Sequence, residues 1–277
     1  MDNLMNAIRA LENNRVRLRF TDAAPMGRSR FGGAPEVPQD FSWPRFTTAT
    51  YDDDQILSRP LAFLAQFDCR EIAPFDREGL LPQSGLLTFF YELGSQRWGF
   101  DPADRGCARV FWFPEETPLS PAAFPDDLPY RLPEMGVSLS AERAFPYAED
   151  FFSGQDPQQA DWDGFFEACG MLEIDDPGNR SGLLGWPDLI QGSAFRDCEL
   201  TARGHYLGHG PVDLSPEDKA AAQAARDNWQ LLFQLDTVEK EGFELMFGDC
   251  GRIYFFIRKE DLAARRFDRV WLILQCG

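Results

Sequence analysis

The hydrophobic pattern of this chain contains one motif twice. In the first copy, an apolar run ends in Gln66-Phe67-Asp68 and an aromatic run follows Gly85. In the second copy, an apolar run ends in Gln234-Leu235-Asp236 and an aromatic run follows Gly251. Short apolar runs bounded by turn residues are typical of buried β-strands. The matched order therefore predicts two similar halves that each contain part of a sheet.

The spacing supports an internal duplication. The Gln and the Gly are 19 positions apart in the first copy and 17 in the second. We expect the halves to span about 29–113 and 180–276, with the proline-rich segment 114–133 joining them. We also expect Trp43-Pro44 of the first half to correspond to Trp186-Pro187 of the second.

The remaining patterns predict further strands and a few short helices. Expected strands are 15–20, 61–68, 86–91, 109–113, 137–140, 198–202, 231–236, 252–256 and 270–275, and expected helices are 2–13, 162–169, 215–227 and 261–266. The predicted fold class is α+β, with mostly antiparallel sheets and an internal duplication of a sheet-containing half. We expect one compact domain over residues 1–277.

Three arginines alternate along the first predicted strand. Arg15, Arg17 and Arg19 are two positions apart, so they share one strand face. In a chain with many carboxylates, a solvated face with weak exposed pairs is the favoured interpretation. The alternative is a strip that binds anions.

The charge balance narrows the possible partners. The chain has 45 Asp and Glu against 27 Lys and Arg, a net charge of −18. This excess disfavours binding to the phosphates of nucleic acids, and it attracts cationic proteins or ligands. The N-terminus lacks the apolar segment of a secretory signal, and no apolar run is long enough to span a bilayer. We therefore expect a cytoplasmic protein with no nucleic-acid partner and no membrane association.

The residues that commonly hold metals or cofactors stand in unfavourable contexts. The six cysteines form no Cys-x-x-Cys pair. His205 and His209 are the only histidines, and the glycines around them oppose the helix that would align them on a metal. Cys250 has no histidine near it in sequence and follows Asp249, so we interpret it as a turn residue. Because phosphate-loop, dinucleotide and nucleophile-elbow motifs are also missing, we predict no metal and no cofactor.

The repeated polar positions are the candidate ligand site. Strand periodicity places Gln66 with Asp68, and Gln234 with Asp236, on one face of each strand. If the halves pack about a pseudo-twofold axis, the four side chains could converge between them. The alternative is structural, because buried Gln and Asp side chains commonly satisfy backbone groups of nearby loops.

Several motifs together resemble the YwqG-like family, a bacterial domain family of unknown function. They are Phe31-Gly32-Gly33-Ala34-Pro35, Trp43-Pro44, Leu64-Ala65-Gln66-Phe67-Asp68, Leu183-Leu184-Gly185-Trp186-Pro187-Asp188, Gln234-Leu235-Asp236 and Phe247-Gly248-Asp249. The resemblance runs from about Phe31 to Gln275 and implies a cytoplasmic α+β protein with a sheet-rich core. It supplies no catalytic residues. Where relatives often carry His before Leu-Leu-Gly, this chain has Arg180-Ser181-Gly182.

These observations favour a non-enzymatic binding or interaction module with a cationic partner. The first alternative is a carboxylate-based enzyme or a small-ligand-binding protein with its site between the two halves, since carboxylates alone can perform acid–base chemistry. A further alternative is an immunity-type protein that neutralises a basic toxin. The sequence does not indicate an oligomeric state.

Overall fold

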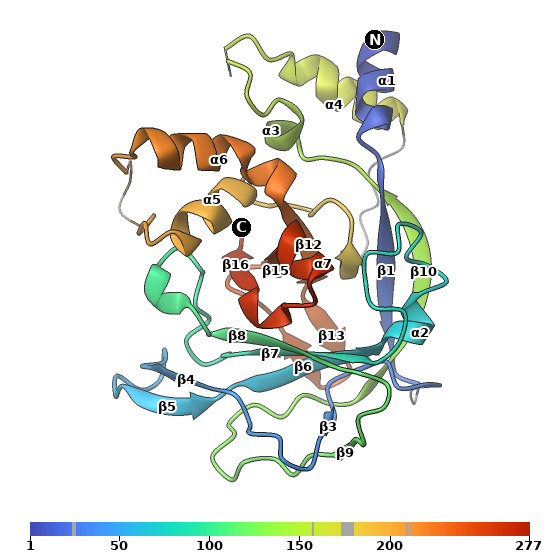
Figure 1. Cartoon of the computed structure of the whole chain (residues 1–277), viewed down its shortest axis with the longest axis vertical. Coiled ribbons are helices and arrows are strands. Elements are labelled where there is room, and N and C mark those ends of the chain that lie inside the picture. Colours follow the sequence, from blue (N-terminus) through green and yellow to red (C-terminus); the bar gives the residue numbers. More distant parts are fainter. Residues whose placement is uncertain (24–25, 157, 173–179, 209, 211) are drawn as a thin grey trace.

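The fold is built on one large sheet. The computed structural model describes residues 1–23, 26–156, 158–172, 180–208, 210 and 212–277. Ten strands form the sheet in the order β16-β15-β12-β11-β1-β10-β2-β6-β7-β8. Most of these strands are labelled in Figure 1. The pairings between these strands are antiparallel throughout the described part of the chain. Together with several short helices, this sheet confirms the predicted α+β class.

The element bounds are as follows. The strands are β1 (Asn13–Thr21), β2 (Arg30–Phe31), β3 (Glu36–Val37), β4 (Arg45–Thr48), β5 (Leu57–Pro60), β6 (Ala62–Asp68), β7 (Leu86–Tyr91), β8 (Ala108–Phe113), β9 (Ser120–Pro121), β10 (Met135–Ala144), β11 (Gly182–Leu184), β12 (Trp229–Leu235), β13 (Val238–Lys240), β14 (Phe243–Leu245), β15 (Arg252–Arg258) and β16 (Trp271–Gln275). The helices are α1 (Asp2–Ala10), α2 (Cys69–Ile72), α3 (Ala148–Phe151), α4 (Trp162–Met171), α5 (Phe195–Ala202), α6 (Pro216–Asn228) and α7 (Lys259–Ala263), with 3₁₀ turns η1 (Pro102–Asp104) and η2 (Phe267–Arg269).

The strand order reads the same from both ends. Strands β1 and β10 form the central pair, and β11, β12, β15 and β16 on one side correspond to β2, β6, β7 and β8 on the other. The registers also agree. Gln66 of β6 lies opposite Arg30 of β2, and Gln234 of β12 lies opposite Gly182 of β11, which is the counterpart of Arg30. A register shift falls at Leu64 in β6 and at Leu232 in β12. This two-sided correspondence supports the proposal that the halves arose by duplication.

The structure corrects one part of the predicted repeat. The backbone N–H that meets the Gln side chain belongs to Glu36 in the first half and to Asp188 in the second. The residue before each is a proline, so Pro187 corresponds to Pro35. The expected equivalence of Trp43 and Trp186 is therefore wrong, because Trp186 occupies the position of Ala34.

The two halves share one core on the inner face of the sheet. Aromatic rings from both halves meet there, with centroid distances of 5.5 Å for Phe67–Phe233 and 5.4 Å for Phe89–Phe255. All four rings are fully buried. Rings at these separations contribute to stability beyond the area they bury.

Different segments cover the outer faces. Phe41 and Trp43 pack on Phe63 and Phe90 of the first half. Helices α5 and α6 cover the second half. The strand predicted at 198–202 is part of helix α5. Its apolar residues Phe195, Cys198 and Ala202 recur at helical spacing, which favours a helix packed on the sheet.

A group of helices stands apart from the sheet. Helices α1, α3 and α4 pack together through a small apolar cluster that includes Ile8, Phe152 and Phe165. Figure 1 shows them at one end of the molecule, next to α6. We call α1, α3 and α4 the helical cap. No described helix is long and apolar enough to cross a membrane.

The arginine strand differs from the favoured interpretation. Arg15 and Arg17 are buried, whereas Arg19 is exposed. Arg15 pairs with Asp188, and Arg17 donates to Glu142 at 2.8 Å. The burial follows from the sheet order, because β1 lies between β10 and β11 and receives carboxylates from neighbouring elements.

Candidate binding site: an acidic groove

The predicted site residues of the first half bind their own loop. The Glu36 backbone N–H donates to Gln66 Oε1 at 2.9 Å, and Gln66 Nε2 donates to the Arg28 carbonyl at 2.8 Å. Two residues on, the Asp68 backbone N–H donates to Ser29 Oγ at 3.0 Å. Gln66 is completely buried. This pair therefore anchors the segment 28–36 to β6.

The second half repeats these contacts. The Asp188 backbone N–H donates to Gln234 Oε1 at 3.0 Å, and Gln234 Nε2 donates to the Arg180 carbonyl. The Asp236 backbone N–H donates to Ser181 Oγ at 3.1 Å. Arg180 and Ser181 are thus the counterparts of Arg28 and Ser29.

The four predicted residues lie in two separate places. Phe67 and Leu235, which stand between each Gln and its Asp, belong to the shared inner core. Strand alternation then directs the Gln and Asp side chains to the outer face of each half. Within the described residues, no hydrogen bond or ion pair joins the pair of one half to the pair of the other. The contacts match the structural alternative, because each amide already binds two backbone groups.

A different region of the surface is hollowed. Three cavities of about 330, 360 and 280 Å³ adjoin one another and share wall residues. Asp52, Gly94 and Tyr130 line both the first and the third, and Tyr51 lines both the second and the third. We call these three cavities together the acidic groove.

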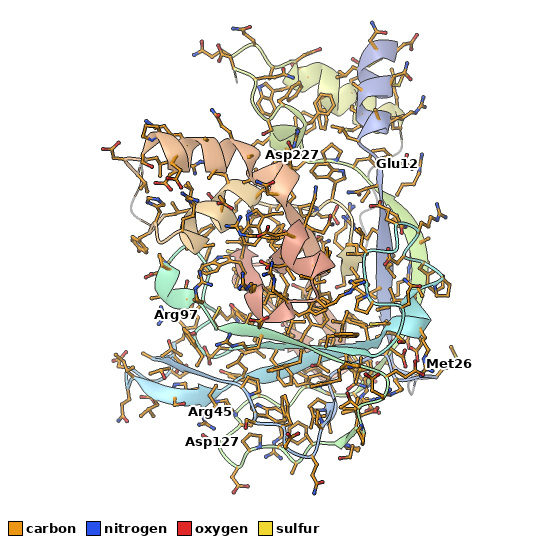
Figure 2. All side chains as sticks on the ribbon, in the orientation of Figure 1. Glu12, Met26, Arg45, Arg97, Asp127 and Asp227 are labelled. Carbon is orange, nitrogen blue, oxygen red and sulfur yellow. The ribbon has the colours of Figure 1, made fainter. Side chains whose placement is uncertain are left out.

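The groove is built by segments that are far apart in the sequence. The loop between β4 and β5 is tied to the loop after β7, because the Tyr51 backbone N–H donates to the Gly94 carbonyl at 3.1 Å. Arg97 Nη2 donates to Thr48 Oγ1 at 2.6 Å across the same junction. Asp127 comes from the segment that precedes β10 and pairs with Arg45 of β4; both are labelled in Figure 2. Three loops therefore form one surface.

Large apolar side chains are exposed around this surface. Tyr51 is 72% exposed, Ile56 73% and Leu57 45%. Tyr130 and Tyr206 are 36% and 43% exposed. Ile56 lies in the loop between β4 and β5, and the other four line the groove. Exposed aromatic and aliphatic groups gathered at a hollow are typical of interaction sites.

Carboxylates dominate the charge of the groove. Seven line it, against two guanidinium groups: Asp52, Asp53, Glu92, Asp101, Asp104, Asp127 and Glu244, against Arg59 and Arg97. Some are paired, as Asp53 is with Arg59 at 2.8 Å. Asp52 and Glu244 have neither an ion pair nor a side-chain hydrogen bond with any described residue. Their charge is therefore available to a partner.

Ionisable groups within the groove respond to this negative field. The pKa of Tyr130 is raised, first by burial and then by the carboxylates Asp52 and Glu92, while Arg59 opposes the rise. The pKa of Asp104 is also raised, mainly by burial. Glu92 is buried and accepts the backbone N–H groups of Gly94 and Ser95, at 3.0 and 2.7 Å. The groove thus keeps negative potential in a partly desolvated setting.

The histidines offer no metal site in the described part of the chain. His205 Nε2 lies 3.1 Å from Asp218 Oδ2, next to helix α6. His209 lies outside the described residues. Among the residues that the structure does describe, no three His, Cys, Asp or Glu side chains gather as metal ligands.

Local signals for the groove are present in the sequence, although the predicted site lies elsewhere. Tyr51 is followed by three consecutive aspartates, and Tyr130 closely follows Asp126 and Asp127. An exposed tyrosine beside several carboxylates is a feature of surfaces that bind cations. Only the fold shows that these two short stretches face the same hollow.

Comparisons with known proteins place the chain in a family without assigning it a role. The family model described as Domain of unknown function (DUF1963) matches residues 29–276. These bounds include both copies of the repeat. A search of curated proteins gave no match.

Proposed function

The chain belongs to the DUF1963 family, a domain of unknown function, and from its own surface we propose that it is a binding protein whose acidic groove receives a cationic segment of a protein partner. One observation carries the proposal. Exposed tyrosines and unpaired carboxylates occupy the same three adjoining cavities.

The chemistry of the groove suits lysine and arginine side chains. A cation over an aromatic ring gains about 0.5–1 kcal/mol at an exposed site, and more where the contact is desolvated. Tyr51 and Tyr130 supply rings, and Asp52 supplies a carboxylate beside them. The aliphatic stems of lysine and arginine can also pack on Ile56 and Leu57. A partner with several basic residues would satisfy these features together.

The alternatives from the sequence are separable from this proposal. A carboxylate enzyme or small-ligand site at Gln66, Asp68, Gln234 and Asp236 stays a prediction, and a ligand there would have to displace hydrogen bonds to two loops. An immunity-type protein that neutralises a basic toxin is a special case of the proposed function, in which the toxin is the cationic partner.

The test compares two doubly substituted variants of equal charge. Asp52→Asn/Glu244→Gln removes the two unpaired carboxylates of the groove, and Asp163→Asn/Glu167→Gln removes two exposed carboxylates of α4. Each immobilised protein is used to capture partners from native lysate, with quantitative mass spectrometry. We expect the groove variant alone to lose a basic partner retained by the wild type, because the two variants differ only in where the charge is lost.

A second pair of variants tests the aromatic contribution. Tyr51→Ser removes a ring that is 72% exposed in the groove, and Phe166→Ser removes one that is 58% exposed on α4. We expect only Tyr51→Ser to weaken capture of the basic partner. If the captured proteins are acidic, or if both members of either pair behave like the wild type, the groove is not the binding site.

A further inference from the structure

A separate cavity lies between the helical cap and the helices that cover the second half. Its volume is about 550 Å³, within the range of small-molecule sites. Phe152 and Trp162 come from the cap side, and Phe195 comes from the start of α5. One face of α6 forms another wall through Lys219, Ala222, Gln223 and Arg226, which recur at helical spacing.

Three cationic side chains, Arg196, Lys219 and Arg226, line this cavity, and Glu149 is the one carboxylate among the described lining residues. Arg196 pairs with Asp197 at 3.3 Å and Arg226 with Asp227 at 3.1 Å. Lys219 has no ion pair or side-chain hydrogen bond among the described residues, so its ammonium is available. In a protein of net charge −18, an unpaired lysine beside two arginines at an apolar cavity is a local exception. The unpaired Lys219 ammonium therefore favours an anion at this wall of the cavity.

Backbone and polar groups add to this preference. Helix α5 begins at the cavity wall, and no side chain caps its N-terminus. The positive end of the helix dipole lies there and attracts anions, and Asp197 in the first turn offsets part of this attraction. Ser193, Gln155 and Gln223 supply neutral polar groups in the same wall.

A hydrogen-bonded cluster around buried Asp150 adjoins the cavity through Ser193, Glu149 and Arg226. Ser193 Oγ donates to Asp150 Oδ1 at 2.5 Å, and Arg226 Nη1 donates to the Asp150 carbonyl at 2.9 Å. The Ser193 backbone N–H donates to Glu149 Oε2 at 2.8 Å. These contacts tie α3 of the cap to α6 and to the segment that leads into α5, so the cavity walls are held together.

We propose that this cavity binds a small organic anion with an apolar or aromatic body. Lys219, with Arg196 and Arg226 in the same wall, would hold its carboxylate, phosphate or sulfonate group, while Phe152, Trp162 and Leu214 would contact its body. This ligand class differs from the cationic partner of the acidic groove, so the two sites can be tested independently.

The probe is 8-anilinonaphthalene-1-sulfonate, a fluorescent aromatic anion, titrated into the full chain. We expect saturable binding of one molecule, displaced by phenyl phosphate or benzoate but not by benzyl alcohol or benzylammonium. Phenyl phosphate and benzoate distinguish a phosphate from a carboxylate preference. Equal displacement by all four compounds would show that apolar contact alone holds the probe, and it would overturn the proposal.

Matched variants locate the binding. Lys219→Glu reverses a charge at the cavity, and Lys259→Glu makes the same reversal at exposed Lys259 of α7. Ala222→Trp fills the cavity, and Ala220→Trp places the same ring on an exposed part of α6. We expect Lys219→Glu and Ala222→Trp each to weaken probe binding by about tenfold or more, equivalent to 1.4 kcal/mol. Unchanged binding in both would place the probe elsewhere and overturn the proposal.

Discussion

At the residue scale, Gln66 and Gln234 show how one side chain can fix a loop. A carboxamide has a donor and an acceptor, and here each binds a backbone group of the segment that crosses the strand. A carboxylate at either position would have no N–H to donate, so one of its oxygens would face the carbonyl oxygen of Arg28 or Arg180. Each position must satisfy one backbone N–H and one backbone carbonyl of the same loop, and this explains why both positions carry glutamine.

Asp150 presents the opposite situation, a buried carboxyl that is incompletely satisfied. Its Oδ2 atom has no hydrogen-bond partner, and burial raises its pKa to about 7 from 3.8, while Ser193 and Arg226 oppose the rise. Because the folded-state pKa exceeds the unfolded value, the folded state binds the proton more tightly. Stability from this group is therefore full below about pH 4 and is lost as pH rises to about 7.

The corresponding prediction concerns Asp150→Asn. We expect the variant to exceed the wild type in free energy of unfolding by about 1–3 kcal/mol at pH 8 and by much less at pH 5, since only the ionised carboxyl carries the burial cost. Urea unfolding at both pH values measures the difference. Exposed Asp40→Asn is the control and should show no such dependence. An equal effect of Asp150→Asn at both pH values would contradict the argument.

At the element scale, the hydrophobic pattern predicts the strands of the sheet better than the segments that cover the sheet. The strands 86–91 and 109–113 were found because continuous apolar runs leave little choice for a buried element. Helix α5 was predicted as a strand, because a short apolar run fits either structure until its packing is known. Simple strand alternation would place Phe63 and Ala65 on one face, but the register shift at Leu64 directs Phe63 to the outer cluster and Ala65 to the inner core.

The candidate sites were harder to predict for a related reason. The acidic groove combines the loops around Tyr51, Gly94 and Tyr130, and no local pattern indicates that they meet. The four Gln and Asp residues were conspicuous in the sequence because they repeat. In each half the repeated glutamine anchors a loop, whereas no repeat marks the residues of the acidic groove.

A stability prediction follows from the shared core. Phe89→Ala and Phe255→Ala should each lower the free energy of unfolding by roughly 3–5 kcal/mol, because both rings are fully buried. Their centroids are 5.4 Å apart, so the double variant should depart from additivity. Denaturant unfolding measures all three variants. Phe166→Ala is the control, since its ring is 58% exposed.

The outcome separates one shared core from two independent ones. Coupling between Phe89 and Phe255 is expected when rings from both halves pack on each other. Strict additivity, or a loss below about 1 kcal/mol for either single variant, would contradict this packing.

At the scale of the whole molecule, charge is unevenly distributed. Net charge −18 creates a field that attracts cations at a distance, but the groove decides where they dock. The cavity that α6 helps to line, with its unpaired Lys219, is a local exception in the same molecule. All charged residues contribute to the long-range attraction, whereas only the groove residues contact the partner. The salt dependence of binding, compared between variants, can distinguish the two contributions.

The last prediction uses this distinction. A basic partner held by the acidic groove should elute as ionic strength rises, because the Debye length falls from about 8 Å at physiological salt to about 3 Å at 1 M. Elution of captured partners over a salt gradient measures this. Asp52→Asn/Glu244→Gln should shift elution to lower salt, and Asp163→Asn/Glu167→Gln should shift it less, because its charges are outside the groove. Partners that stay bound at 1 M salt, or an equal shift in both variants, would show that the groove carboxylates do not hold them.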